Sequence, residues 1–466
     1  MSRSKELIKN TGILMVAKIS TQIVSFLLLP LYTALLTTAQ YGRVDIYTSL
    51  AMIIIPFLTL QTEMGLFRFF IAYQDDESKR RVVSSAFAVV AKCVFLFSIC
   101  FLIVSVLFKI EYAVLLYGYY LTMTVSTVFL QLCRAEGNNI AYGVATFLSS
   151  AVAVTLNVVF VAIFKLGVQG ILLSTILAQS ISIVYMVFKT HAFRFYSREF
   201  IDKKEEKRLL EYSVPLVFNQ ISSWAVNYSD RIIILLFWGE SLNGIYSIAN
   251  KFSNITSTFF GVYNVAWTEN VVRCIDDDDS KLYITKIFNM TFSLYLILVT
   301  GIVNLLPFFF SLMVNEAYSD AYQHVPLLLF GMFFSGMAAT LGSVFIAKNK
   351  TKDVSVTTML AGICNIIVHF ALLKPCKLYA ASISTMVSFG ALFAYRYIFV
   401  NKFFKVRLNV TKVMPHVIAF VIAWIGYGSK NIFIIVIGFI VNLANIAVLI
   451  MQNRELIMKM TIKRGM

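Results

Sequence analysis

The chain has 466 residues, of which 59% are hydrophobic and 14% are charged, with a mean hydropathy of +0.78. A soluble domain carries about a quarter charged residues, so this composition excludes an ordinary soluble protein and predicts a polytopic membrane protein. The net charge is +16, and the six cysteines form no C-x-x-C pair, which indicates neither a disulfide framework nor a zinc site.

The chain begins with the basic stretch MSRSKELIKN, which an apolar run from Thr11 to Leu36 follows. This run is too long for the apolar part of a cleavable signal peptide and lacks a small-residue cleavage site. It predicts a retained first helix. A membrane-spanning helix needs about 20 largely apolar residues, and the chain offers fourteen such segments. The predicted helices cover residues 11–35, 46–71, 82–108, 112–132, 141–164, 167–188, 212–237, 242–266, 286–310, 323–346, 354–373, 377–399, 413–427 and 431–450.

Seven charged residues are assigned to the interior of the membrane, where each costs roughly 2.5–3.5 kcal/mol at a helix centre. Such residues normally face the interior of a helix bundle or a water-filled cavity, so all seven are candidate site residues. Five are bases and two are acids, which leaves an expected net charge of +3 inside the membrane. In chain order they are Lys18, Glu63, Arg68, Lys92, Asp230, Arg231 and Lys251. Lys286, Lys377 and Arg396, at the ends of predicted helices, are counted with the loops.

The spacing of these residues limits which of them can pair. Glu63 and Arg68 are five residues apart and do not share a helix face. Asp230 and Arg231 are adjacent in the stretch NYSDRIIILLFWG, so their side chains point about 100° apart. Each therefore needs a partner on another helix or in water. Two interpretations stay open for this pair: an interhelical salt bridge that fixes packing, and a polar site beside a water-filled path.

A cationic, water-filled cavity would attract an anionic substrate such as a phosphate or a pyrophosphate. Arginine binds phosphate with two parallel hydrogen bonds, and lysine acts as a point charge. Glu63 and Asp230 are candidates for coupling to H⁺ or Na⁺, because burial disfavours the charged form of a carboxylate. Arg68 has the alternative of extending to the membrane interface. The candidate substrate-binding residues are Lys18, Arg68, Lys92, Arg231 and Lys251.

No catalytic or metal-binding constellation is visible in the sequence. The four histidines are dispersed without the spacing of metal ligands. The acidic run at Asp276–Asp279 is typical of a solvated loop. We therefore predict no catalytic residue, no metal and no cofactor beyond a possible coupling ion.

The distribution of Lys and Arg predicts the orientation of the helices. Cytoplasmic loops hold the excess of positive charge in membrane proteins. With the N-terminus inside, alternate loops are strongly basic, and the intervening loops hold few cations. The pattern favours an even number of helices with both termini in the cytoplasm. It also explains the net charge without a nucleic-acid partner.

The longest inside loop, KTHAFRFYSREFIDKKEEKRLLEY, separates six predicted helices from eight. It is typical of an amphipathic surface helix that anionic lipid headgroups attract. The predicted domains are therefore an N-terminal six-helix lobe at 1–190, a cytoplasmic linker at 191–211 and a C-terminal six-helix lobe at 212–400. An extra helix pair with a cytoplasmic tail follows at 401–466.

The two halves resemble each other weakly, which predicts an internal repeat. AQYGRVDIYTSL follows the first helix and SLNGIYSIANKF follows the seventh, so that Gly42 corresponds to Gly244. Asn157 likewise corresponds to Asn365, in stretches that each carry a Ser-Thr pair further on. Units of six helices keep the same orientation, so the repeats would be parallel, with a substrate site between the halves.

Two parts of the chain carry a family resemblance. FLLLPLYTALLTTAQYG and TLQTEMGLFRFF stand in the first part, and EYSVPLVFNQISSWAVNYSDRIIILLFWGESLNGIYSIANKF and AWTEN in the second. Over residues 5–75 and 205–272 the chain resembles the Wzx-type polysaccharide flippases. These belong to the multidrug/oligosaccharidyl-lipid/polysaccharide exporter superfamily.

The resemblance implies an all-α, MATE-like fold with two six-helix lobes around a central cavity. It implies transport of an undecaprenyl-pyrophosphate-linked oligosaccharide from the cytoplasmic to the periplasmic leaflet of a bacterial inner membrane, by alternating access, as in O-antigen synthesis for lipopolysaccharide. The positions it carries over as lumen residues are Glu63, Arg68, Asp230, Arg231 and Lys251. Membrane lipids, polysaccharide polymerase and chain-length proteins are the implied partners. The last helix pair resembles the lipid II flippase branch, where such a pair forms a groove for a lipid tail.

Two other functions are alternatives to that of a flippase. A multidrug antiporter of the same fold needs a more acidic and aromatic cavity than the expected net charge of +3 provides. A membrane enzyme such as a polysaccharide polymerase or ligase needs catalytic residues on a sizeable periplasmic loop. The longest outside loop, near 311–322, offers only Glu316 and Asp320 as charged residues.

Overall fold

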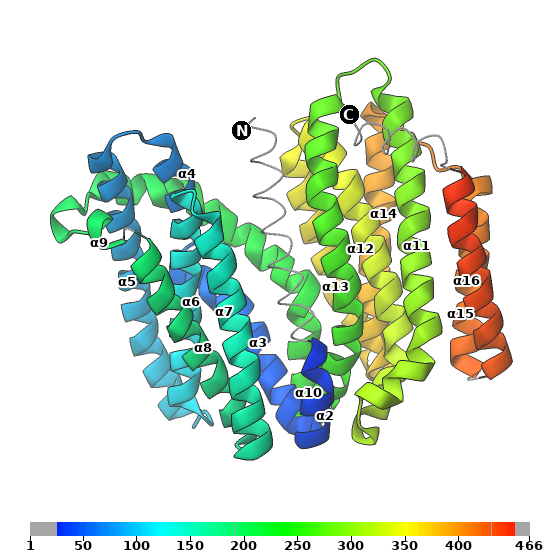
Figure 1. Cartoon of the computed structure of the whole chain (residues 1–466), viewed down its shortest axis with the longest axis horizontal. Helices are drawn as coiled ribbons and strands as arrows, with labels where there is room; N and C mark the ends of the chain where they lie inside the picture. Colours follow the sequence, from blue (N-terminus) through cyan, green and yellow to red (C-terminus); the bar gives the residue numbers. More distant parts are fainter. Residues whose placement is uncertain (1–25, 191, 430, 453–466) are drawn as a thin grey trace. The chain divides into compact units, whose positions relative to one another are not determined.

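The computed structural model describes residues 26–190, 192–429 and 431–452, and these residues form helices without a strand (Figure 1). Twelve of the described helices are long and apolar enough to cross a bilayer, with the two parts of α10 counted as one. The predicted first helix begins outside the described residues. The all-α class and the plan of membrane-spanning helices are therefore confirmed for the described part of the chain.

The chain divides into two compact units that interleave along the sequence. The first unit contains the residues up to Trp224 together with Arg231–Gly244, and the second contains Ala225–Asp230 and the residues from Ile245 on. The predicted domain ranges, drawn from the sequence, stay a prediction. The first unit holds α2 (Leu29–Leu35), α3 (Thr38–Thr59), α4 (Thr62–Ala72), α5 (Asp76–Leu107), α6 (Ala113–Ala135), α7 (Asn139–Asn157), the π-helix η1 (Val158–Ile163), α8 (Gly167–Lys189), α9 (Ala192–Phe195) and the 3₁₀ turn η2 (Arg198–Phe200).

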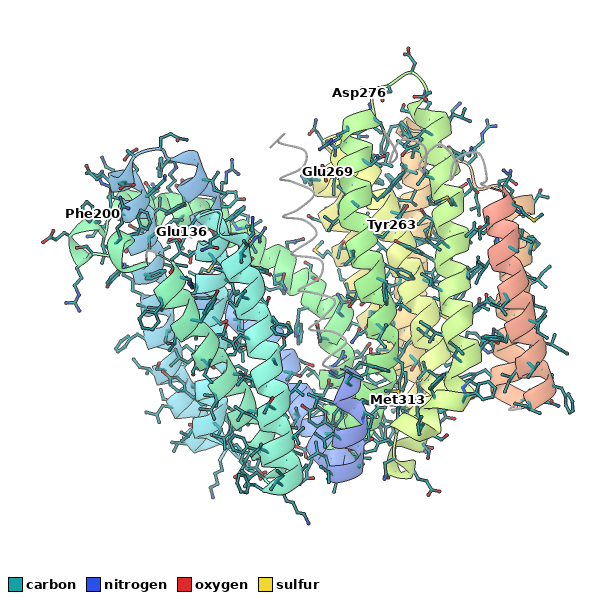
Figure 2. All side chains as sticks on the ribbon, viewed as in Figure 1. Glu136, Phe200, Tyr263, Glu269, Asp276 and Met313 are labelled. Atoms are coloured by element: carbon teal, nitrogen blue, oxygen red, sulfur yellow. The ribbon has the colours of Figure 1, made fainter. Side chains whose placement is uncertain are left out.

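The second unit contains most of the later helices. Its loop at Asp276 and the end of α11 near Met313 lie at opposite ends of the unit, as expected for a helix that crosses a bilayer (Figure 2). The helices are α11 (Ser280–Met313), the 3₁₀ helix η3 (Glu316–His324), α12 (Val325–Ala347), α13 (Thr351–Cys376), α14 (Tyr379–Phe403), α15 (Val410–Ser429) and α16 (Ile432–Gln452). Parts of α10 (Lys203–Cys274) belong to each unit.

Exposed apolar side chains show which solvent these helices are built for. On α5, Phe95 is 69% exposed and Leu107 is 71% exposed. In the most apolar stretch of α5 only 11% of the residues are buried, whereas the corresponding value for the span of η3 and α12 is 72%. A helix satisfies its own backbone hydrogen bonds, so it can be surrounded by lipid. Its exposed apolar side chains are favourable in contact with lipid and unfavourable in contact with water. The chain is a multi-pass membrane protein.

The second predicted helix, 46–71, is divided into α3 and α4. Leu60 and Gln61 both adopt the left-handed region, with φ of 46° and 56°, and this break separates α3 from α4. The N-terminal end also differs, because α3 begins at Thr38. Thr37 caps it in a capping box with Gln40, in which each side chain bonds the other residue's backbone N–H. Arg43 and Asp45, which the sequence prediction placed in a loop, therefore belong to α3.

The predicted surface helix over 191–211 is wrong in its extent. The short helices α9 and η2 occupy the first part, and from Lys203 the chain is already in α10, which continues through the predicted seventh helix. This helix is broken only at Gly239, where φ is 83° and ψ is 179°. Glycine adopts this conformation without the steric cost that a Cβ imposes. We call the helices before and after Gly239 the first and second parts of α10.

The two glycines that the predicted repeat relates to each other are in contact. A Cβ added to Gly42 on α3 would lie 1.9 Å from the backbone O of Glu240, and one added to Gly244 would lie 2.0 Å from the backbone O of Thr38. Only glycine permits this approach of two helix backbones. We call this crossing of α3 and the second part of α10, which lies within the first unit, the glycine contact.

Polar side chains reinforce the glycine contact. Asn243 donates through Nδ2 to the backbone O of Gly42 at 2.9 Å. Arg43 donates through Nε and Nη2 to the two carboxylate oxygens of Glu240, both at 2.9 Å, which is the paired geometry that arginine and carboxylate favour. The crossing therefore holds the start of α3 and residues 240–244 together as one rigid element.

Candidate functional site

Asp230 is a buried acid of the second unit, and it is 2% exposed. Tyr246 Oη donates to its Oδ2 at 2.9 Å, and Thr385 Oγ1 donates to the same oxygen at 2.7 Å. His369 Nδ1 lies 2.9 Å from Oδ1. These residues come from both parts of α10, from α13 and from α14, so the fold brings distant parts of the sequence to one acid.

The surroundings of this acid leave polar atoms without partners. Asn365 donates through Nδ2 to Thr385 Oγ1 at 3.5 Å. Within the described residues, Asn365 Oδ1 and His369 Nε2 are buried and have no hydrogen-bond partner. An unpartnered buried polar atom is costly unless a water, an ion or a ligand completes its bonding. We call Asp230, Tyr246, Asn365, His369 and Thr385 the acid cluster.

The acid cluster has the groups that ion coupling requires. If His369 carries its proton on Nδ1, it donates to Asp230, and Nε2 is left as an acceptor. A carboxylate and an imidazole in contact can share, take up or release a proton. The carboxylate oxygens, Thr385 Oγ1 and Asn365 Oδ1 are also the oxygen ligands that a hard cation such as Na⁺ prefers.

Arg231 makes its ion pair in the first unit. Its Nε donates to Asp45 Oδ2 at 2.9 Å, with the two side chains 4% and 13% exposed. Asn243 Nδ2 lies 3.4 Å from the same carboxylate oxygen. The prediction that Asp230 and Arg231 take separate partners is thus confirmed. The expectation that Arg231 is an unmatched cation is wrong, because the predicted charge count omitted Asp45.

We expect the buried pair of Arg231 and Asp45 to contribute strongly to stability. Replacing Asp45 with Asn should lower the free energy of unfolding by about 3–5 kcal/mol, because it leaves a buried guanidinium without its acid. In a double-mutant cycle with Arg231→Gln, the double variant should lose less than the sum of the single losses. Denaturation of the purified protein in detergent measures each value.

The exposed pair of Arg81 and Glu77, with side chains 47% and 61% exposed, is the matched control. Its cycle should give about 0.5 kcal/mol or less, as exposed i,i+4 pairs do. Additive losses for Asp45→Asn and Arg231→Gln would contradict the energetic role assigned to the buried pair.

Glu63 is the buried acid of the first unit. It lies in the first turn of α4, just after the left-handed residues Leu60 and Gln61, and is 2% exposed. Its Oε2 has no hydrogen-bond partner within the described residues. Glu63 therefore stays a candidate for ion coupling, separate from the acid cluster.

Arg68 and Lys92, two predicted cations of the first unit, both contact residues of α10. Arg68 is exposed, and its guanidinium lies 4.6 Å from the ring centroid of Tyr212 rather than beside Glu63. Lys92, 65% exposed, contacts both carboxylate oxygens of Glu206 at 2.7 Å. The expectation that Lys92 has no acid partner is thus wrong, because that acid comes from the predicted linker.

Two more predicted residues complete the set. Lys251 is half-buried on the second part of α10, and Lys18 lies outside the described residues. The role of all five bases in substrate binding stays a prediction.

Sequence reasoning missed four polar partners of Asp230 and Arg231: Asp45, Tyr246, His369 and Thr385. The histidine carried a usable signal, because His369 stands in the apolar stretch NIIVHFALL, where a titratable residue is as unusual as the seven charged ones. The hydroxyl residues carried none, since serine and threonine are common in membrane helices and bond to their own helix backbone.

Comparisons with known proteins give a family and a fold. A family model described as "Polysaccharide biosynthesis protein" matches residues 7–268. No curated protein matches the sequence. The chain is similar to the solved structure of the lipid II flippase MurJ in an inward closed conformation, with 12% identity and a TM-score of 0.71, over 97% of this chain and 100% of that one.

The chain is also similar to an inward-facing multidrug resistance MATE family transporter of the MOP superfamily. The identity is 15% and the TM-score 0.66, over 83% of this chain and 97% of that one. An outward-facing transporter of that family gives 14% and 0.59, over 84% and 95%. At these identities the similarity concerns the fold, and it confirms the predicted MATE-like architecture.

Proposed function

The chain belongs to the family of polysaccharide biosynthesis proteins, and on this premise we propose that it is a flippase for a lipid-linked oligosaccharide. The substrate would be an oligosaccharide repeat unit on undecaprenyl pyrophosphate, moved from the cytoplasmic to the periplasmic leaflet of a bacterial inner membrane by alternating access. The observation that carries the proposal is the match to this family over residues 7–268, in a chain whose described part has a transporter fold. The chain would act without catalysing a chemical reaction.

The physical task explains why this fold suits such a substrate. The sugar and pyrophosphate groups are strongly hydrated, and hydrocarbon offers them no hydrogen bonds. A flippase has to supply polar surface along the path while the lipid tail stays in the bilayer. Both termini would lie in the cytoplasm, on the side where the lipid-linked unit is assembled.

The acid cluster supports coupling of this movement to an ion, and we propose H⁺. Asp230 and His369 are buried together, and intramembrane acids and histidines mark proton pathways in transporters. Uptake of a proton would remove the carboxylate charge that Tyr246 and Thr385 now bond, and would change the contacts joining α10, α13 and α14. Na⁺ is the alternative ion for the same oxygens.

Deletion of the gene in the source cell tests the flippase proposal. We expect surface polysaccharide to disappear and the lipid-linked repeat unit to accumulate in the inner leaflet, with both effects reversed by the wild-type gene. Mass spectrometry of extracted lipids measures the accumulation. Normal display of every surface glycan in the deletion strain would contradict the proposal.

A multidrug antiporter is the second candidate, favoured by the similarity to multidrug transporters of the same fold. It predicts that deletion raises sensitivity to cationic drugs and leaves the surface glycan intact, whereas the flippase predicts the reverse. Drug-susceptibility profiles of the same deletion strain distinguish them. For a flippase, the partners would include polysaccharide polymerase and chain-length proteins, and the product would be a glycan such as O-antigen.

A further inference from the structure

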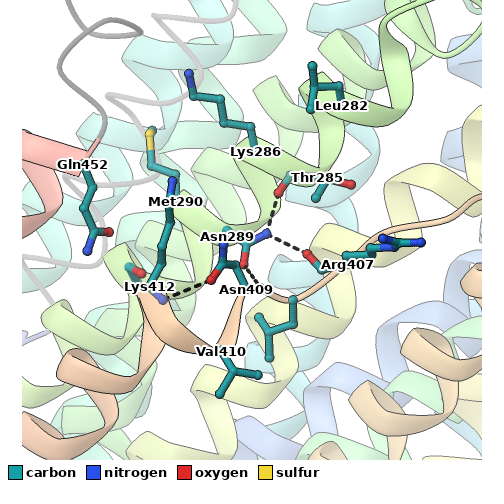
Figure 3. Close-up of a pocket in the computed structure, with 12 residues that line it drawn as sticks. Leu282, Thr285, Lys286, Asn289, Met290, Arg407, Asn409, Val410, Lys412 and Gln452 are labelled. Carbon is teal, nitrogen blue, oxygen red and sulfur yellow. Dashed lines mark hydrogen bonds between the residues drawn. The ribbon is translucent and has the colours of Figure 1, made fainter.

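A basic pocket lies in the second unit, away from the residues of the acid cluster. It has a volume of about 680 Å³ and lies where the start of α11, the segment before α15 and the end of α16 meet (Figure 3). The segment of residues 404–409, which connects α14 to α15, is not helical. The lining residues are Leu282, Thr285, Lys286, Asn289, Met290, Ser293, Arg407, Leu408, Asn409, Val410, Lys412 and Gln452.

A buried asparagine joins two of the segments that line this pocket. Asn289 is 8% exposed, and its Nδ2 donates to the backbone O of Thr285 at 2.7 Å and of Arg407 at 2.8 Å. Its Oδ1 accepts from the backbone N of Asn409 at 2.6 Å. Figure 3 shows these bonds, which fix the segment before α15 to α11. The positions of Arg407 and Lys412 relative to Lys286 are therefore set by the fold.

The charge of the pocket has one sign. Lys286, Arg407 and Lys412 line it, and no Asp or Glu among the residues that the structure describes does. None of these three cations forms an ion pair with another residue that the structure describes, whereas Lys92 and Arg231 both have acid partners. Lys286 is half-buried, and Arg407 and Lys412 are exposed. Three cations around one cavity match a phosphate group, which accepts several charged hydrogen bonds.

An apolar strip leads away from the pocket along α15. It begins at Val410, which lines the pocket, and its members recur at intervals of three and four residues, so they share one helix face. These exposed apolar side chains can contact the acyl chains of a lipid. A soluble phosphate has no apolar part that would contact them. The strip consists of Val410 (58% exposed), Met414 (45%), Ile418 (52%), Val421 (48%) and Ile425 (54%).

We propose that this basic pocket binds the phosphate headgroup of an acidic membrane phospholipid, whose acyl chains lie along the apolar strip of α15. The Lys and Arg distribution predicts that this end of α11 faces the cytoplasmic leaflet. Anionic lipids of that leaflet attract basic segments of membrane proteins. The bound lipid would hold α15 and α16 against α11. The proposal concerns lipid binding and does not depend on what the protein transports.

Native mass spectrometry of the full-length protein in detergent tests the proposal, with dioleoylphosphatidylglycerol as the probe. We expect one lipid to bind preferentially, and the triple variant Lys286→Gln/Arg407→Gln/Lys412→Gln to bind it about 100-fold more weakly. The charge-matched control is Lys165→Gln/Lys352→Gln/Lys374→Gln, three exposed cations outside the pocket without a described ion pair. The control should bind as the wild type does.

Two further probes decide whether the occupant is a lipid. Dioleoylphosphatidylcholine should bind at least 10-fold more weakly than the acidic lipid, because its headgroup has no net charge. Inorganic pyrophosphate should not displace the bound lipid at equal concentration. Equal binding of the two lipids, equal loss in the control variant, or displacement by pyrophosphate would each overturn the proposal. Size-exclusion chromatography of each variant confirms that it is folded.

Discussion

Asp230→Asn is expected to reduce transport about 100-fold while the protein stays folded in the membrane. The substitution keeps the shape of the side chain and removes its charge and its ability to take up a proton. A hundredfold loss corresponds to about 2.7 kcal/mol, which is comparable to one charge-assisted hydrogen bond. The measurement is restoration of surface polysaccharide in the deletion strain, together with uptake of the lipid-linked unit into vesicles at several pH values.

Asp278→Asn is the matched control, because Asp278 is exposed in the loop before α11. It should transport at the wild-type rate. His369→Gln should also reduce transport, since the imidazole bonds the same carboxylate. Wild-type transport by folded Asp230→Asn would show that the acid cluster only holds α10, α13 and α14 together.

Gly42→Ala is expected to prevent accumulation of folded protein. An added Cβ at 1.9 Å from the backbone O of Glu240 cannot be accommodated by a side-chain rotation, because the atom that it meets belongs to a helix backbone. Overpacking usually costs about 1–3 kcal/mol, and a backbone clash lies at or above the upper end of that range. Fluorescence-detected size-exclusion chromatography and thermal unfolding in detergent measure the loss.

Gly261→Ala, on the second part of α10, is the control for the glycine contact. Nothing lies within 4 Å of a Cβ at this position, so alanine should be neutral or should stabilise the helix by up to about 1 kcal/mol. Gly244→Ala should resemble Gly42→Ala. Normal yield and stability of Gly42→Ala would mean that α3 and residues 240–244 are less tightly packed than the structure shows.

The membrane-spanning helices could be predicted from the sequence because lipid imposes a simple requirement. About 20 apolar residues in a row satisfy it, and the pattern is visible without knowledge of the fold. The breaks within these helices were not visible. Leu60 and Gln61 are ordinary residues for a helix, and neither is a residue type that favours the left-handed region that both adopt. The start of α3 was missed for a related reason, since Arg43 and Asp45 are polar and find their partners elsewhere in the fold.

The candidate site could be predicted only in part. Charged residues in apolar segments are conspicuous, so Glu63 and Asp230 were identified as candidates, and both are buried. Their partners could not be assigned, because ion pairs form between residues far apart in the chain. Asp45 is 186 positions from Arg231, and Glu206 is 114 positions from Lys92. A count of charges along single helices therefore gave an excess of cations, which the pairing of Arg231 and Lys92 across helices reduces.

The interleaving of the two units limits how the chain can be divided. A fragment ending in the linker, near residue 211, would lack the stretch Arg231–Gly244 that the first unit includes. Arg43 would lose Glu240, Asp45 would lose Arg231, and Gly42 would lose its contact with Gly244. Co-translational assembly of the first unit can therefore be completed only after synthesis has passed Gly239 and entered the second part of α10.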